Sequence, residues 1–342
     1  MSDPFDLSFN YAHGAPCGDA LLRSSADDFQ VEELLDIPLS DCGEHHWLHI
    51  QKRDTNTEWL ARQLARLAGV PARDVSYAGL KDRIAVTTQW FSVRLPGKME
   101  PDWRSIENNN IKLLSFGRHR AKLRRGAHNG NAFIITLRQL EGDRDLIEQR
   151  LSIIKAKGVA NYFGEQRFGH GGRNVSNGVA LLKGEIKVKD RHKRGLYLSA
   201  VRSYLFNKIL SQRVADGSWQ KILLGEAVML SGSNSHFLAE TVDDELTKRL
   251  AEGDIHPSAP LWGRGRTATA LVAHEYEQAA LAPYQEILEK MEHIGLEQSR
   301  RTLRLCVPDL NWSWGDDKTL ILKFRLPVGA YATSLLREVI RY

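Results

Sequence analysis

The chain has 342 residues, 42% of them hydrophobic and 26% charged, which is typical of a soluble globular protein with about two domains. No apolar run approaches the roughly 18 residues that a membrane span requires, and the first residues lack a signal-peptide pattern, so we expect a cytoplasmic protein without membrane association. The three cysteines form no CxxC motif, which argues against thiol redox chemistry and zinc ribbons.

The net charge of +5 is unevenly distributed along the chain. Residues 112–138 include seven basic residues and no acidic ones, and residues 183–213 include nine basic and two acidic ones. The rest of the chain is therefore net negative. Two concentrated positive segments are typical of a protein that binds a phosphate backbone, although ordinary solvated faces also carry such runs.

The first predicted elements in chain order are two strands, at 28–36 and 46–52, separated by polar turn residues. A helix is predicted from Thr55. The sequence TNTE has the form of a capping box with Glu58 three residues after Thr55, and leucines then recur at helical spacing until Gly69.

The next elements are a short extended segment at 75–78, a glycine turn that contains Asp82, and a strand at 85–95. Alternate residues of this strand face opposite sides of a sheet. Asp82 is therefore expected in a tight turn at the start of a strand. A sheet can hold such a loop while leaving it accessible, which is how scaffolds present reactive groups.

Another strand is predicted from Asn131, followed by a helix from Glu141 to about Gly158. From about 160 to 300 the pattern changes to helical segments broken by Gly- and Ser-rich turns, and the alternating strand pattern returns at Leu310. Strand-rich segments at both ends of a different middle part predict one domain split by an insertion.

Several common chemistries find no motif in this sequence. A phosphate-binding GxxxxGK[ST] loop, a strand-linked GxGxxG, HEXXH and a GxSxG elbow are all absent. Glu44, His45, His46 and His49 lie close together, but adjacent strand residues point to opposite faces, so no metal site is expected there. What remains is Asp82 itself, between two cationic neighbours. Nearby cations favour an ionised carboxylate, which suits a nucleophile or a base rather than a general acid.

Two longer motifs are more specific: YAGLKDRIAVTTQ at 77–89 and NYFGEQRFG at 161–169. With DDFQVEE, GEHHWLHIQK, GNAFIITLR, KDRHKRG, LSAVRSYLFN and LPVGAYATSLLREVI, they make almost the whole chain resemble the TruD-type tRNA pseudouridine synthases. The resemblance implies an α+β fold, a pseudouridine synthase catalytic domain with a mainly antiparallel mixed sheet flanked by helices. It further implies that this domain is split between 1–156 and 303–342, with an inserted α/β TRUD-specific domain at 157–302.

The resemblance also implies a function. The family isomerises uridine to pseudouridine in RNA, and bacterial members usually act on uridine 13 of certain tRNAs, of the tRNA(Glu) type. We therefore expect a tRNA-binding isomerase that acts as a monomer, with no cofactor, no metal and no protein partner. Its carboxylate would either attack C1′ of the ribose or remove a proton from C2′, and the sequence leaves both routes open.

Site residues follow from matching positions. Asp82 matches the catalytic aspartate that all pseudouridine synthases share. At two positions this sequence departs from the family, with Arg in place of a common Lys thought to pair with that aspartate, and Tyr in place of a common Phe. Phe29 and Phe133 could also be ordinary core residues of strands, and Asn131 a turn residue before a strand. The implied substrate-binding residues are Arg23, Phe29, Asn131, Phe133 and Tyr331.

The two basic segments are expected to bind phosphates of the tRNA, one from each domain, so that the RNA would lie between the domains and be read mainly by shape. Lys81 and Arg83 are expected to contact RNA or solvent. The candidates for backbone contacts are Arg118, Arg120, Lys122, Arg124, Arg125, Lys189, Arg191, Lys193 and Arg194.

Two functions other than tRNA isomerisation are also open for this sequence. A catalytically silent RNA-binding protein of the same fold would bind tRNA without forming pseudouridine. An enzyme that processes nucleosides or glycosides would need a second carboxylate near Asp82, for which Glu32, Glu33 and Glu44 are the candidates.

Overall fold

The computed structural model describes residues 5–97, 100–316 and 318–342. The chain divides into two compact units. The first, called the sheet unit here, comprises Gly18–Ile147, Val307–Gly329 and Ile340–Tyr342; the second, the helical unit, comprises Met1–Cys17, Glu148–Cys306 and Ala330–Val339. The fold is α+β, as expected, whereas the insertion boundaries at 157 and 302 stay a prediction.

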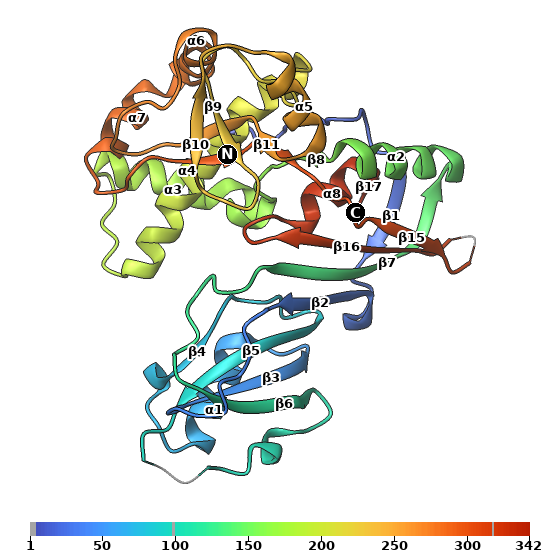
Figure 1. Cartoon of the computed structure of the whole chain (residues 1–342), viewed down its shortest axis with the longest axis vertical. Coiled ribbons are helices and arrows are strands. Elements are labelled where there is room, and N and C mark those ends of the chain that lie inside the picture. The colour runs from blue at the N-terminus through green and yellow to red at the C-terminus, as the bar shows by residue number, and fades with distance from the viewer. Residues whose placement is uncertain (1–4, 98–99, 317) are drawn as a thin grey trace. The chain divides into compact units, whose positions relative to one another are not determined.

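A mixed sheet organises the sheet unit (Figure 1). Its strand order is β15-β16-β7-β2-β5-β3-β6 within the described part of the chain, with β4 on β5, β1 on β7 and β17 on β1. β2 is parallel to β5 and β1 to β17, and the other pairs are antiparallel. The strands are β1 Gly18–Leu22, β2 Phe29–Leu34, β3 His45–Arg53, β4 Val75–Tyr77, β5 Val86–Arg94, β6 Ile111–His119, β7 Gly130–Gly142, β15 Asn311–Trp314, β16 Leu320–Pro327 and β17 Ile340–Arg341.

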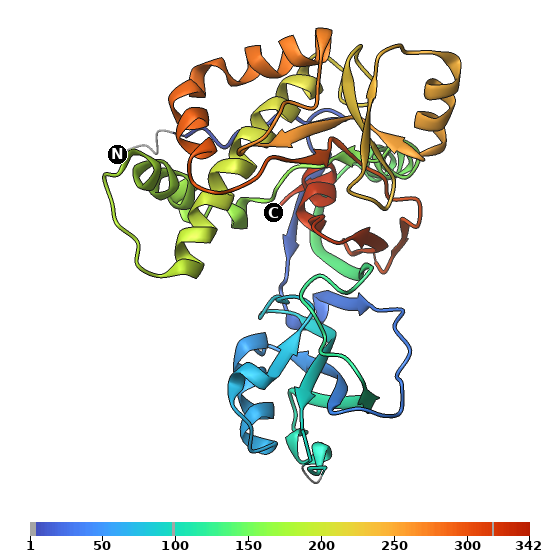
Figure 2. The same ribbon diagram turned by 60° about the vertical axis from the view of Figure 1, so that its left-hand side comes forward.

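One helix, α1 (Thr57–Leu67), packs on the face of this sheet formed by β3 and β5 (Figure 2). Leu60 and Leu64 of α1 are fully buried in a cluster with Ile50 and Phe91 of the strands. The 3.6-residue spacing of these leucines and the two-residue spacing on the strands place both apolar rows on the shared side. Short 3₁₀ turns lie at Ala26–Asp28, Ala72–Asp74 and Trp103–Ile106.

The predicted cap of α1 is wrong by one residue. The Asn56 side chain, not that of Thr55, accepts the backbone N–H groups of Glu58 (2.9 Å) and Trp59 (3.0 Å). The Thr55 hydroxyl instead donates to the carbonyl of Arg53 at 2.6 Å. Thr55 thus closes the turn after β3, and Asn56 satisfies the free N–H groups of the first helical turn.

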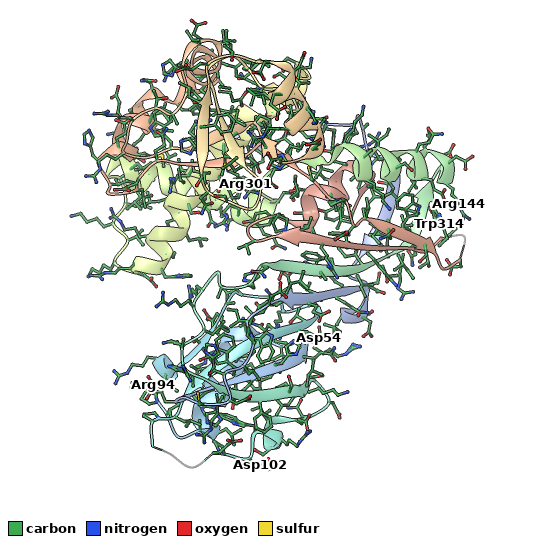
Figure 3. The ribbon with its side chains drawn as sticks, in the orientation of Figure 1. Asp54, Arg94, Asp102, Arg144, Arg301 and Trp314 are labelled. Carbon is green, nitrogen blue, oxygen red and sulfur yellow. The ribbon has the colours of Figure 1, made fainter. Side chains whose placement is uncertain are left out.

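The next helix, α2 (Arg144–Lys157), begins later than predicted from Glu141. β7 continues to Gly142, and the Asp143 side chain accepts the N–H groups of Asp145 (2.9 Å) and Leu146 (3.2 Å). An acidic cap therefore ends the strand and starts the helix. The side chain of Arg144 lies 4.5 Å from the ring centroid of Trp314, which is labelled beside it in Figure 3.

The helical unit contains more short strands than the sequence pattern predicted. They pair as β10-β9-β11, β12-β13 and β14-β8. Its elements are β8 Val159–Ala160, α3 Arg173–Lys183, α4 Arg191–Ala215, β9 Glu226–Leu230, β10 His236–Ala239, α5 Asp244–Glu252, β11 Ile255–His256, β12 Ser258–Leu261, α6 Leu271–Leu281, α7 Gln285–Glu292, β13 Ser299–Thr302, β14 Arg304–Leu305 and α8 Ala332–Val339, with 3₁₀ turns at Glu165–Arg167, His170–Gly172 and Ala282–Tyr284.

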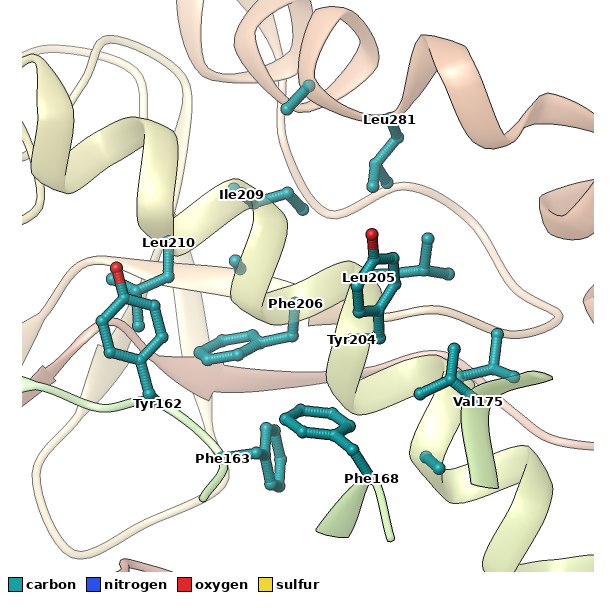
Figure 4. Packing of buried hydrophobic residues seen from close by; sticks show 14 of the residues in the cluster. Tyr162, Phe163, Phe168, Val175, Tyr204, Leu205, Phe206, Ile209, Leu210 and Leu281 are labelled. Atoms are coloured by element: carbon teal, nitrogen blue, oxygen red, sulfur yellow. The ribbon is translucent and has the colours of Figure 1, made fainter. Parts of the chain in front are cut away.

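The core of the helical unit surrounds α4 (Figure 4). Phe206 of α4 meets the ring of Phe163 edge to face at 5.5 Å. The Asn207 amide, fully buried, accepts from the backbone N–H of Phe163 (2.9 Å) and donates to its carbonyl (3.0 Å). Arg301, labelled in Figure 3, covers the same Phe163 ring at 4.2 Å. The NYFG segment is thus held through its backbone by Asn207 and through the ring of Phe163 by Phe206 and Arg301.

A membrane-spanning helix would need a long apolar stretch, and none of the helices in the described ranges is long and apolar enough to provide one.

Candidate active site

Asp82 lies in the loop between β4 and β5, whose ends are fixed by the buried residues Ala78 and Ala85. Its side chain is 38% exposed, so the carboxylate is accessible. Oδ2 of Asp82 accepts a hydrogen bond from Nη2 of Arg23 at 3.0 Å. The cation expected to pair with this acid is therefore in contact with it.

Arg23 has an unusual backbone conformation. It directly follows β1 and has φ of 62°, in the left-handed region that costs roughly 1–2 kcal/mol for a residue with a side chain. Its guanidinium lies 4.0 Å from the ring centroid of Phe29. A planar guanidinium can stack on an aromatic face while donating to a carboxylate from its edge. A Lys ammonium group is not planar and cannot make this stacked contact, so the replacement of the common Lys by Arg changes the geometry of the pair with Asp82.

Phe29 and Phe133 lie side by side on one face of the sheet. Phe29 is on β2 and Phe133 on β7, paired so that Val31 faces Phe133, and the two rings meet edge to face at 6.3 Å. Phe133 also stacks on Phe324 of β16 at 5.2 Å. Both rings are buried, as ordinary core packing requires, and Phe29 is the one of the two that contacts Arg23.

Lys81 does not face solvent, contrary to the prediction. Its side chain is only 6% exposed, and Nζ lies 3.0 Å from Oε2 of Glu33 and donates to Oδ1 of Asn131 at 2.7 Å. Arg83 is exposed. The predicted substrate contact Asn131 is therefore attached to the residue beside Asp82, and Glu33 is neutralised by Lys81.

Glu44, His45 and His46 have partners of their own, away from Asp82. Glu44 pairs with Arg94 at 2.9 Å on the surface, in the part of the sheet unit where Figure 3 labels Arg94. His45 lies 3.3 Å from the Ser92 hydroxyl, and His46 lies 3.4 Å from Nε1 of Trp103. These contacts account for Glu44, His45 and His46 as local structure.

Lys52 is a component of the site that sequence reasoning missed. It is fully buried on β3, where Nζ donates to the backbone carbonyl of Thr55 at 2.7 Å and to that of Asp82 at 3.1 Å. Burial lowers the pKa of Lys52 from 10.5 to about 8, opposed by the negative charge of Asp82. One signal was present: Leu48 and Ile50 set an apolar alternation that Lys52 interrupts.

The basic segment of the sheet unit supplies part of the lining of a cavity. Leu123 is buried against Trp47 and Ala78, and the N–H of Gly126 donates to the Ala78 carbonyl at 2.8 Å, so the segment is attached to the chain that leads to Asp82. The five predicted phosphate-binding side chains here are exposed, namely Arg118, Arg120, Lys122, Arg124 and Arg125. A cavity of about 550 Å³ is lined by the last three of these together with Arg62, Glu58, Tyr77 and neighbouring residues.

The helical unit carries the other predicted residues. Asp190 caps α4 by accepting the N–H groups of His192 (2.8 Å) and Lys193 (3.1 Å), and basic side chains occupy the first turn, where the helix dipole disfavours cations. Tyr331 accepts from the Arg167 guanidinium through its hydroxyl, a contact that Phe would lack. The four predicted phosphate-binding residues of this unit are all exposed, namely Lys189, Arg191, Lys193 and Arg194.

The chain is similar to known proteins over almost its whole length. A family model described as tRNA pseudouridine synthase D (TruD) matches residues 8–189 and 186–339. The tRNA pseudouridine synthase D of Nitrosococcus oceani is 50% identical over 333 residues, covering 97% of this chain and 93% of that protein. That of Methylococcus capsulatus is 49% identical over 331 residues, covering 97% and 94%.

One solved structure shows the same fold. It is a crystal structure from Methanosarcina mazei, described as a TruD-type protein, with a TM-score of 0.77 at 22% identity and coverage of 99% of this chain and 96% of that one. Together with the family model and the relatives, which share close to half of their residues with this chain, these findings show that the chain belongs to the tRNA pseudouridine synthase D (TruD) family.

Proposed function

We propose that this protein converts uridine to pseudouridine in tRNA, with Asp82 as the catalytic residue. The observation that carries the proposal is the contact between Asp82 and Arg23 at 3.0 Å beside the buried ring of Phe29, in a chain of the TruD family. An accessible carboxylate, held by a cation that itself stacks on an aromatic ring, suits attack on a ribose next to a stacked base.

The reaction needs no oxidant or outside group. The C1′–N1 bond breaks, the uracil rotates, C5 bonds to C1′, the proton on C5 is lost and N1 gains one, so that product and substrate are isomers. The Asp82 carboxylate starts it, either by attacking C1′ or by taking a proton from C2′. Arg23 orients that carboxylate through its hydrogen bond to Oδ2.

The target nucleotide must leave its stack first, which costs a few kcal/mol. Exposed apolar side chains on both sides of Asp82, Leu80 and Ile84, are 56% and 57% exposed and suit contact with an extruded nucleotide. The substrate we propose is uridine 13 of tRNA(Glu)-type molecules. The two exposed basic segments, one on each unit, support phosphate contacts with an RNA of this size.

Chemical mapping of pseudouridine in tRNA treated with the purified protein tests this function. The native protein should form pseudouridine at position 13, and Asp82→Asn should form none while binding tRNA with unchanged affinity. Pseudouridine at another position would refute only the assignment of uridine 13 as the target. A native protein that binds tRNA and forms no pseudouridine would instead support the silent RNA-binding protein.

A further inference from the structure

Three buried polar side chains with hydrogen-bond partners lie where α1 packs on β3 and β5 of the sheet unit. Lys52 is on β3, Gln89 on β5 and Thr57 in the first turn of α1, and all three are fully buried. Lys52 occupies the position that follows Leu48 and Ile50 in the apolar row of β3, and Gln89 shares its side of β5 with the fully buried Phe91. Buried polar groups are costly unless they are hydrogen-bonded, so their partners indicate why they are there.

Their partners are backbone groups of one short segment, the loop 79–82. Nε2 of Gln89 donates to the carbonyl of Gly79 at 3.1 Å. Oγ1 of Thr57 accepts from the N–H of Lys81 at 3.2 Å and donates to Oε1 of Gln89 at 3.0 Å. Nζ of Lys52 donates to the carbonyl of Asp82 at 3.1 Å. Three of the four residues of this loop are thus held from beneath through their backbone.

Apart from the side-chain contacts of Lys81 with Glu33 and Asn131 and of Asp82 with Arg23, few contacts fix the loop and the residues that follow it. Leu80 and Ile84 are exposed, so its own apolar side chains contribute little burial, and its two buried anchors, Ala78 and Ala85, lie at its ends. Segments with few buried apolar contacts open at low free energy. Hydrogen bonds to successive backbone groups restrict the loop's dihedral angles, and those angles set the direction of the Cα–Cβ bond of Asp82.

Holding the loop through a buried Lys52 costs free energy, because a charged group is removed from water. The hydrogen-bond partners of Lys52 are two neutral carbonyls, those of Thr55 and Asp82. The negative charge of Asp82 favours the charged form of Lys52, and the positive charge of Lys81 opposes it. The turn that brings Thr55 back to Lys52 includes Asp54, labelled in Figure 3, whose φ of 45° is also left-handed. A hydrophobic residue at position 52 would fit the strand pattern without burying a charge.

We propose that Lys52, Thr57 and Gln89 are positioning residues, which hold the backbone of the loop 79–82 so that the Asp82 carboxylate is aimed at the ribose of the target uridine. The inference rests on the proposed function. Near-attack geometry is sensitive to displacements of about 1 Å, which can cost about 100-fold in rate. None of the three side chains needs to touch the RNA.

The experiment compares isosteric variants by single-turnover kinetics and by tRNA affinity. Thr57→Val removes both hydrogen bonds of the hydroxyl with little change in volume, and Thr57→Ser restores them. Thr87 provides a matched control, because it lies opposite Lys52 on β5, is equally buried, and its hydroxyl has no hydrogen-bond partner within the described residues. Tritium release from tRNA labelled at uridine C5 gives the rate, and filter binding gives Kd.

We expect Thr57→Val, Gln89→Met and Lys52→Met each to lower the single-turnover rate by about 10-fold or more, with Kd for tRNA within about twofold of the native value. Thr57→Ser and Thr87→Val should react at the native rate. Circular dichroism and urea unfolding identify any variant that is not folded. If Lys52→Met or Gln89→Met fails to fold, the rates of Thr57→Val and Thr57→Ser test the inference.

Native rates in a folded Thr57→Val would overturn the inference, and so would an equal loss of rate in Thr87→Val, which would indicate general damage to the core. A loss of tRNA affinity that accounts for the whole loss of activity would overturn it as well. Failure of the proposed function looks different, since the native protein itself would then release no tritium.

Discussion

Arg23 and Asp82 are joined by an ion pair between residues that are 59 positions apart in sequence, and Arg23 makes it from a left-handed backbone conformation. The guanidinium lies between the Asp82 carboxylate and the face of Phe29. Strained backbone persists where the surrounding structure fixes it, and it occurs more often at functional sites. We interpret the strain at Arg23 as a cost in stability that is retained for the geometry of the acid.

Replacing Arg23 should therefore separate activity from stability. Arg23→Gly loses a half-exposed ion pair that contributes about 0–1 kcal/mol, but it relieves a left-handed conformation that Gly adopts freely. We expect a free energy of unfolding within about 1 kcal/mol of native and a single-turnover rate at least about 10-fold lower. Arg23→Gln should be similarly slow yet about 1 kcal/mol less stable than the Gly variant. Urea unfolding and tritium release measure both quantities, and a native rate in Arg23→Gly would contradict the role of this residue.

Asn56, not Thr55, should control the start of α1. Asn56→Ala removes the acceptor of two N–H groups and should destabilise the protein by about 1 kcal/mol, as for other N-cap replacements. Asn56→Asp keeps an acceptor at the helix N-terminus and should be as stable as the native protein or slightly more so. Thermal unfolding followed by circular dichroism distinguishes the two variants, and equal midpoints for them would show that the cap contributes nothing.

The pKa of Lys52 makes a specific prediction for stability against pH. Burial lowers this pKa from 10.5 to about 8, so between these values the unfolded chain keeps a proton that the folded chain has released. Raising the pH through this window therefore favours the folded state, at up to about 1.4 kcal/mol per pH unit.

Compared with Lys52→Met, the native protein should gain stability from pH 8 to about 10.5 and show no further relative change above it. The comparison with the variant cancels the titration of other groups. Urea unfolding of both proteins at several pH values gives the difference. Parallel stability curves across the window would mean that Lys52 is not a buried charge.

The basic segment of the sheet unit, beside the 550 Å³ cavity, should contribute to RNA affinity mainly through contacts with phosphates. Replacing Arg124 and Arg125 by Ala should weaken tRNA binding and reduce the salt dependence of log K, by roughly 0.7–0.9 for each lost phosphate contact. Arg104 and Lys318, which are about as exposed on the same unit, provide a double-alanine control of equal charge. Filter binding between low and moderate salt measures both slopes. An unchanged slope in the Arg124 and Arg125 variant would mean that this segment does not contact RNA.

Much of the sheet unit is predictable from local patterns. The strands at 29–34, 45–53, 86–94 and 130–142 follow the alternation of apolar residues, and the leucine spacing predicts α1. The ends of elements are harder to predict. The sequence predicts that two helices begin at Thr55 and Glu141, whereas Asn56 and Asp143 are the residues that cap them. Several polar residues near each end can cap, and only the path of the chain decides which one does.

The sequence by itself determined the family, the loop that carries Asp82, and the residues that could surround it, because these depend on motif and on strand alternation. The tertiary structure alone decided which way polar side chains point. Lys81 looks like a solvated neighbour of Asp82 but bonds to Glu33 and Asn131, while Lys52 looks like a surface lysine but is buried under Asp82. The physical reason is that the cost of burying a charge depends on partners far away in sequence, which no local pattern records.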